Sequence, residues 1–426
     1  MKIFKSKSFL MWIFIVALYC LLAVRDMMSI NIPQYLILAV GVAYIPFANY
    51  KNLVSYCAFL IPLIIGINAL IMFFILVALY LKAKKINRYQ YQFLFYFIPA
   101  EVILYLLLPS DHRINDIFIY SSLLALFFYL MFDENKNVDY DTAIKLFCYS
   151  GVFALFLVAY KFYEKFGLTG IFLQRMDDIY KYDENFDTTL QVFSLNANNT
   201  GYYSAVIYAC MLLGRKRLKI PTIIYWPLFG LNILIAGLTV SRTWLIVVCF
   251  ITLLYCFFQM SKIKLAIAVA LIFILGGSLG IYFQQYTETF NTRLHNKSME
   301  GGNGRIELFE EYNQFMIDNP GYDFMGTGTV SYKEIIPIHN SMHNGIQQIF
   351  VCTGIIGLLI FVYSGVSFYK QFIKHRKIKF IYFLPFIAAF IFLQTIQFLN
   401  PHFLMLPVCI CLMSIKMGAT KQYLLQ

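Results

Sequence analysis

Long apolar runs alternate with short polar segments from one end of the 426-residue chain to the other. The runs lack the strict two-residue alternation of a half-buried strand. Many of them approach the length of about 20 residues that a helix needs to cross a bilayer. The pattern therefore predicts an all-α, polytopic integral membrane protein with about 12–14 transmembrane helices. The runs lie near residues 9–24, 32–48, 53–81, 91–108, 116–132, 143–160, 198–213, 221–239, 243–260, 263–283, 344–369, 380–398 and 401–415.

The composition agrees with a membrane protein. The chain is 60% hydrophobic and 13% charged, whereas soluble domains average about 25% charged residues. The net charge of +12 does not indicate a nucleic-acid partner, because the basic residues fall in short loops between apolar runs. The basic N-terminus has no small-residue cleavage site, so we expect a retained first helix. The nine cysteines lie mostly inside apolar runs, so we expect neither a disulfide framework nor a metal or other cofactor.

Four basic loops predict the topology. They are residues 81–88, 215–219, 261–264 and 374–379, and the positive-inside rule places all of them in the cytoplasm. Counting runs between them puts residues 161–197, the turn at 240–242 and the long segment 284–343 on the outer side. The expected organisation is then residues 1–283 with transmembrane helices and the outer loop 161–197, residues 284–343 as a large outer loop, and residues 344–426 with the last helices.

One run does not fit this count. Residues 53–81 form a 29-residue run with Pro62, Gly66 and Asn68 near its centre. If it were one helix, the basic N-terminus and the loop at 81–88 would lie on opposite sides. We interpret it as two short helices or a re-entrant hairpin, and a long tilted helix with the N-terminus outside is the alternative.

Two arginines stand where the predicted outer side begins. Arg242 lies between two apolar runs, where it either snorkels to headgroups or binds an anion. Arg305 lies at the start of a predicted amphipathic helix in the segment 303–317, with Ile306, Phe309, Phe315 and Met316 expected on its apolar side. A helix N-terminus attracts anions, and an arginine there adds a bidentate phosphate donor. The alternative for Arg305 is an ion pair with a nearby glutamate.

Two histidines precede the run at 344–369. His339 and His343 would share one face if their segment were already helical. Histidine suits general-base chemistry near neutral pH, and the spacing also suits two zinc ligands. No third ligand is obvious, so we do not expect a metal site. A solvated or capping histidine is the other interpretation.

Four segments resemble the bacterial O-antigen polymerase and O-antigen ligase superfamily, the Wzy-type and WaaL-type membrane glycosyltransferases. His343 and Gly354 have the eleven-residue spacing of the family's loop histidine and the glycine that opens Gly-x-x-Gly. The chain departs from the family pattern at Phe309, where tryptophan is usual, at Cys352, where an acid is usual, and at Thr243, where a smaller residue is usual. The segments are SLNANNTGYYSA (194–205), TVSRTWL (239–245), GRIELFEEYNQFMIDNPGYDFMGTGT (304–329) and HNSMHNGIQQIFVCTGIIGLLIF (339–361).

The resemblance implies a metal-independent, GT-C-like glycosyltransferase of the bacterial inner membrane, with its site on the periplasmic or extracellular side. The donor and the acceptor would be oligosaccharides on undecaprenyl diphosphate. His343 would take the acceptor proton, and Arg242 and Arg305 would stabilise the leaving diphosphate. The further substrate-binding residues implied are Arg293, His339, Ser241 and Asn344. The lipid bilayer, a chain-length regulator and a flippase of the same pathway are the other expected partners.

Three functions compete at this stage. We favour a polymerase that extends lipid-linked repeats into O-antigen, capsular or exopolysaccharide. A ligase that transfers the glycan to lipid A core is the first alternative. A transporter or flippase of lipid-linked sugars is the second, and it predicts ionisable residues near the bilayer midplane. Ionisable residues inside the runs are few: Glu101 is the clearest, and His402 lies near a helix start. The polar residues gather instead in the segment 284–343.

Overall fold

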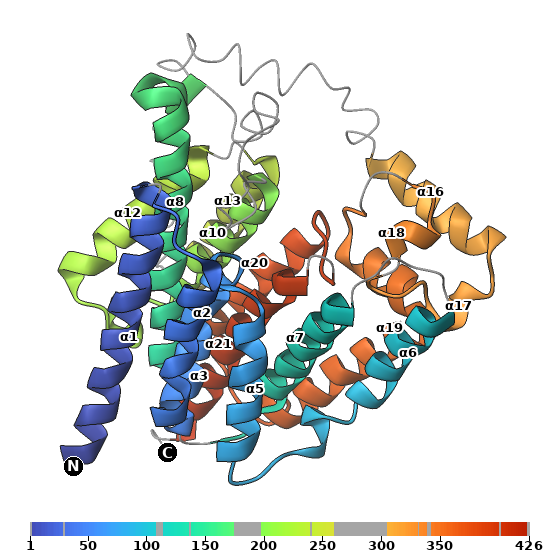
Figure 1. The fold of residues 1–426 in the computed structure, drawn as a ribbon, viewed down its shortest axis with the longest axis horizontal. Coiled ribbons are helices and arrows are strands. Elements are labelled where there is room, and N and C mark those ends of the chain that lie inside the picture. Colours follow the sequence, from blue (N-terminus) through green and yellow to red (C-terminus); the bar gives the residue numbers. More distant parts are fainter. Residues whose placement is uncertain are drawn as a thin grey trace.

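The computed structural model describes most of the chain. The described residues are 2–28, 30–107, 114–135, 138–173, 197–238, 241–259, 305–330, 332–338, 342–399 and 402–423. They form helices and no strand (Figure 1), which confirms the predicted all-α class. The predicted run at 263–283 and Arg293 lie outside the described residues.

The described helices follow in this order along the chain. The N-terminal half contains α1 (Lys2–Met27), α2 (Gln34–Ala43), η1 (Ile45–Phe47), α3 (Tyr50–Leu60), η2 (Ile61–Leu63), α4 (Ile64–Ile67), α5 (Leu70–Lys82), η3 (Arg88–Gln90), α6 (Leu94–Leu107), α7 (Ile114–Phe132) and α8 (Tyr140–Leu173). The C-terminal half contains α10 (Ala197–Met211), α11 (Arg215–Leu218), α12 (Thr222–Leu238), α13 (Arg242–Gln259), α16 (Arg305–Asp318), α17 (Tyr322–Met325), α18 (Tyr332–Ile335), α19 (Gly345–Phe368), the π-helical turn η6 (Tyr369–Ile373), η7 (Phe380–Phe383), α20 (Leu384–Leu393), η8 (His402–Met405) and α21 (Leu406–Tyr423).

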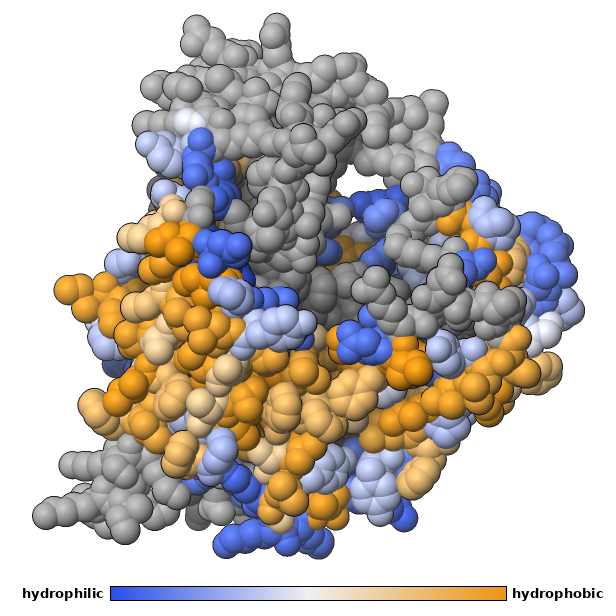
Figure 2. Space-filling model, viewed as in Figure 1, coloured by the Kyte–Doolittle hydropathy of each residue, from blue (hydrophilic) through white to orange (hydrophobic). Residues whose placement is uncertain are grey.

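Five stretches of helix among the described residues are long and apolar enough to cross a membrane. This confirms the polytopic membrane class, and the total number of spans stays a prediction, because other predicted runs form helices of 10–17 residues. Hydrophobic residues cover the middle of the visible face, and hydrophilic residues lie at its lower edge and around α16 (Figure 2). The five are Ser8–Met27, Arg88–Leu107, Ile114–Phe132, Tyr140–Glu164 and Gly345–Ile373.

Contacts between loops define two ends of the helix bundle. The Lys82 ammonium donates to the carbonyls of Ile45 at 2.8 Å and Pro46 at 3.1 Å, which joins the end of α5 to the α2–α3 turn. Lys51 pairs with Asp139 at 3.2 Å and Lys219 with Asp141 at 3.3 Å. We call this the basic end, because it holds the loops 81–88, 215–219 and 374–379, as predicted. Both chain termini lie there, and α16, α17 and α18 lie toward the opposite end, the loop end (Figure 1).

The run at 53–81 consists of two helical arms with a sharp turn, as one of the two interpretations predicted. The first arm is α3, η2 and α4, and the second is α5. Asn68 joins them with a φ of 135°, and its side chain accepts from the Leu70 N–H at 2.9 Å. Asparagine tolerates positive φ better than most residues. The turn places the α1 N-terminus and the loop at 81–88 at the same end.

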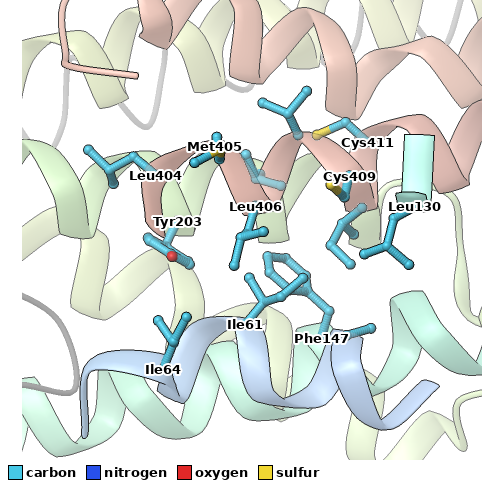
Figure 3. Close-up of a cluster of buried hydrophobic side chains, with 14 of the residues drawn as sticks. Ile61, Ile64, Leu130, Phe147, Tyr203, Leu404, Met405, Leu406, Cys409 and Cys411 are labelled. Atoms are coloured by element: carbon cyan, nitrogen blue, oxygen red, sulfur yellow. The ribbon is translucent and has the colours of Figure 1, made fainter. Parts of the chain in front are cut away.

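The core lies where α21 crosses the N-terminal helices. The Cys409 side chain of α21 lies toward Ile61 and Phe147 from η2 and α8, whereas Cys411 points to the other side, where its thiol lies 3.2 Å from the Pro385 carbonyl oxygen of α20 (Figure 3). All four side chains are fully or almost fully buried. A mostly apolar α21 therefore anchors the bundle. The C-terminal half of the chain, which carries the candidate site, is thereby fixed to the N-terminal half.

Candidate functional site

The helix α13 begins at the loop end with Arg242 as its first residue. Ser241 precedes it and is buried, and its hydroxyl accepts from the Trp244 N–H at 3.3 Å. The Trp244 indole N–H in turn donates to the Ser204 hydroxyl of α10 at 3.0 Å. Serine is a preferred N-cap, so Ser241 has a structural role at the start of α13. The side chain of Arg242 lies outside what the structure describes.

The first turn of α10 lies against the start of α13. A β-carbon added at Gly201 would lie 3.3 Å from the Ser241 hydroxyl and 3.4 Å from the ring of Phe392 at the end of α20. Thr200 is fully buried, and its hydroxyl has no hydrogen-bond partner among the described residues. The starts of α10 and α13 and the end of α20 therefore meet at one point.

The start of α19 also contacts the end of α20. Asn344 caps this helix, because its side-chain oxygen accepts from the N–H groups of Ile346 at 2.9 Å and Gln347 at 3.0 Å. A β-carbon at Gly345 would lie 2.9 Å from the Leu393 carbonyl oxygen of α20. Only glycine fits such a close approach without a shift. The end of α20 thus lies between the starts of α13 and α19.

His343 and Arg305 lie near one another at this end. His343 directly precedes the Asn344 cap and is half-buried. Burial, and then the positive charge of Arg305, lower the pKa of His343. A lowered pKa keeps the imidazole neutral near pH 7, which is the form that accepts a proton. A neutral imidazole and a positively charged guanidinium therefore lie near one another at this end.

A glycine breaks α19 further along and lets the loop attach. Gly354 has a φ of 66°, and a β-carbon there would lie 2.2 Å from the Phe324 carbonyl oxygen. The loop N–H groups of Thr327 and Gly328 donate to the α19 carbonyls of Val351 and Cys352, each at 2.9 Å. The break thus exposes carbonyls that the loop satisfies.

The helix α6 contacts both the broken part of α19 and the loop. Tyr96 of α6 donates its hydroxyl proton to the Thr353 carbonyl of α19 at 2.9 Å. The buried carboxylate of Glu101, also on α6, accepts from the N–H and the hydroxyl of Thr329. Glu101 therefore holds the loop segment 326–329 in place among the described residues. This contact gives no support to a transport role for Glu101.

An open groove lies between the loop helices and α19. Its volume is about 640 Å³. Ile317 and Phe324 at its rim are 70% and 64% exposed, so an apolar surface continues from the loop helices onto the membrane helix. The groove is lined by Asn313, Met316, Ile317, Asp323, Phe324, Phe350 and Ile355.

The predicted apolar side of α16 is wrong for two of its four residues. The buried side of α16 consists of Leu308, Tyr312 and Met316, which recur every four residues. Met316 was predicted there, whereas Ile306 and Phe309 are 54% and 42% exposed. The contact with α19 selects that stripe. The condition for a shared helical face of the two histidines is not met at His343, because α19 begins two residues later. His339 lies outside the described residues.

The structure thus brings part of the predicted site together. Arg305, His343 and Asn344 form one group, and Ser241 with the backbone of Arg242 joins it through the end of α20. His402 starts η8, and its side chain is not described. Sequence reasoning missed Thr200 and Gln347. The asparagine-rich start of α10 pointed toward Thr200, and no sequence pattern pointed toward Gln347.

The site belongs to an integral membrane protein with a helical loop packed over the starts of several membrane helices. Residues 227–362 match the family described as O-antigen ligase. This match supports the resemblance of the chain to the O-antigen polymerase and ligase superfamily. The matched segment contains Ser241, Arg242, Arg305 and His343. The family implies a glycosyltransferase-like enzyme. No curated protein matches the chain.

Proposed function

We propose that this protein is a polymerase that joins oligosaccharide repeat units linked to undecaprenyl diphosphate. A hydroxyl of the acceptor glycan attacks the anomeric carbon of the donor sugar, and a glycosidic bond forms. The bond from that carbon to the diphosphate oxygen breaks, and undecaprenyl diphosphate leaves with the electron pair. The hydroxyl proton passes to the neutral imidazole of His343. The basic end faces the cytoplasm, and the loop end is the outer face of the inner membrane.

One observation carries the proposal: basic residues stand at the N-termini of helices that meet at the loop end. Arg242 is the first residue of α13, Arg305 is the first residue of α16, and His343 precedes the cap of α19. Helix N-termini are already positive, and a base there is unfavourable for the fold alone. The same arrangement suits a bound anion. A leaving diphosphate is such an anion, and its charge grows in the transition state.

The groove supports a lipid-linked donor. It adjoins Asn313, which contacts α19 near the Asn344 cap, and it extends to Ile355 in the membrane helix. Ile355 lies twelve residues after His343, which corresponds to about 18 Å along a helix. A diphosphate at the Arg305–His343 pair would place the first isoprene units along this apolar surface.

In this proposal the arginines and the helix N-termini neutralise the diphosphate, and no metal ion takes part. Arginine matches the geometry of phosphate oxygens with two parallel donors. The effect is largest where water is excluded. Arg293 and His339 remain proposed auxiliary contacts to the substrate.

Purified protein provides the test. With lipid-linked repeats alone, a polymerase converts them into a ladder of longer lipid-linked glycans. With lipid A core added, a ligase transfers the repeats to it and forms a new glycolipid. Without lipid A core, a ligase leaves the repeats unextended. The ligase is the second candidate, because the matched family carries that description. Transport of intact repeats across a vesicle membrane without any longer product would contradict both.

A further inference from the structure

Gln347 connects the membrane helix α19 to the loop helix α16. The side chain is buried. Its amide nitrogen donates both protons, one to the Phe309 carbonyl oxygen at 2.8 Å and one to the Asn313 side-chain oxygen at 3.1 Å. Both acceptors belong to α16, so the two hydrogen bonds fix this helix in position and in rotation about its axis.

The two groups of the proposed reaction lie one helical turn from this contact. Arg305 precedes Phe309 by four residues on α16, which corresponds to about 6 Å along the axis. His343 precedes Gln347 by four residues, and the Asn344 cap orders the turn between them. A shift of α16 against α19 would therefore move Arg305 relative to His343.

A separate contact attaches the loop itself. The hydrogen bonds of Thr327 and Gly328 to the α19 carbonyls hold the far end of the loop, and Gly326 packs against Cys352. Loss of the Gln347 hydrogen bonds would therefore loosen α16 without releasing the loop. One set of contacts thus attaches the loop to α19, and a different set aligns α16 against α19.

We infer that Gln347 is a positioning residue that sets the distance between Arg305 and His343 across the two helices. The effect of Gln347 on the reaction rests on the proposed function. The hydrogen bonds between Gln347 and α16 do not depend on that function. Gln347 touches neither donor nor acceptor and acts through α16. Its loss should therefore change a property of His343 as well as the rate.

Gln347→Met tests the inference, because methionine has a similar size and no N–H donors. We expect Arg305 to move away from His343, and the pKa of His343 to rise toward its ordinary value. The low-pH limb of kcat/KM should shift to higher pH, because the neutral imidazole is lost at a higher pH. Misplacement by about 1 Å lowers rates up to about 10²-fold. Gln314→Met is the matched control, since Gln314 is exposed on α16 and donates only to Asp318 at 2.9 Å among its described contacts.

The pKa of His343 is measured without substrate by NMR titration of the histidine-labelled protein, with His343→Ala to assign the signal. A double-mutant cycle adds the decisive comparison. In an Arg305→Gln background, Gln347→Met should leave the pKa of His343 unchanged, because the charge that Gln347 positions is gone. Asn313→Ala removes one of the two acceptors of Gln347 and should raise the pKa of His343 by a smaller amount. This variant replaces Gln347→Met in the test if Gln347→Met folds poorly.

Two results would overturn the inference. One is a Gln347→Met protein that loses activity while the pKa of His343 and the low-pH limb stay at their wild-type values, which indicates a structural role only. The other is a full pKa shift that persists in the Arg305→Gln background. Failure of the proposed function gives a different result. The wild-type protein would then not extend the glycans, while the titrations would still show that Gln347 and Arg305 together affect the pKa of His343.

Discussion

The two ends of the helix bundle use their positive charges in opposite ways. At the basic end, several lysines contact carbonyl or carboxylate oxygens. Lys416, fully buried on α21, donates to the Leu130 and Asp133 carbonyls at 2.8 and 2.9 Å, at the end of α7. Lys82 does the same for the α2–α3 turn. Positive groups at helix C-termini are favourable.

At the loop end, basic residues lie at the N-termini of their helices. Arg305 begins α16 and lies near a second base, His343, whose pKa it lowers. Arg242 begins α13. A positive charge at a helix N-terminus is unfavourable to the helix dipole. The charges at the basic end thus complement the helix dipoles, and those at the loop end lie where we propose that the diphosphate binds.

The largest expected difference between the ends concerns histidine. His343→Ala should lower glycan extension by about 10²–10⁴-fold, the usual contribution of one positioned base, while the purified protein still binds lipid-linked donor. His375→Ala is the control, because His375 is exposed in the loop at 374–379 of the basic end. Product ladders and donor binding measure the two effects. Equal activity of both variants would remove His343 from the base role.

The second prediction concerns arginine. Arg305→Gln should lower the rate by about 10²–10³-fold, the typical loss when one preorganised donor to a transition state is removed. The pKa of His343 should also rise, so the loss should be greater at pH 6 than at pH 8. Arg88→Gln at the basic end is the control, because Arg88 is exposed there. A pH-independent loss would show that Arg305 does not act on His343.

Hydropathy and loop charge were sufficient to predict the class and the shared end of the basic loops. Asn68 and Pro62 indicated the break in the run at 53–81, because their backbone preferences are local. The break at Gly354 was not predictable. The run around it is mostly apolar and reads as one continuous helix, and the requirement for glycine comes from Phe324, thirty residues earlier in the chain.

The site was only partly predictable for the same reason. Arg305 and His343 were chosen by residue type and resemblance, and only the packing of α16 on α19 brings them together. The face of α16 was misassigned, because apolar residues occur on several of its sides and the partner selects Leu308, Tyr312 and Met316. Gln347 has no sequence signature, since its role depends on two acceptors on another helix.

The third prediction is a loss of stability at the basic end. Lys416→Met leaves the Leu130 and Asp133 carbonyls without their donor, and each unsatisfied buried acceptor costs about 1–3 kcal/mol. The midpoint of thermal unfolding in detergent should fall, while the folded fraction extends glycans at the wild-type rate. Lys377→Met is the control, because Lys377 is exposed. A lower kcat with unchanged stability would contradict the structural role of Lys416.

The smallest expected effect comes from changing one helix cap at each end of the bundle. Asn344 caps α19 at the loop end, and Asn49 caps α3 at the basic end, where its side chain accepts from the Asn52 N–H at 2.8 Å. Aspartate caps helices about as well as asparagine, so Asn344→Asp and Asn49→Asp should both retain stability. Only Asn344→Asp adds a negative charge where we place the diphosphate.

We therefore expect Asn344→Asp to raise the KM for the lipid-linked donor by about fivefold to tenfold, which corresponds to about 1 kcal/mol for like charges near a solvated surface. Added salt should reduce the difference, because it screens exposed charges. Asn49→Asp should leave KM unchanged at every salt concentration. If both variants gave the wild-type KM, the diphosphate would not lie at the start of α19, and the contrast between the ends would lose its functional meaning. If both raised it equally, the effect would come from net charge and not from position.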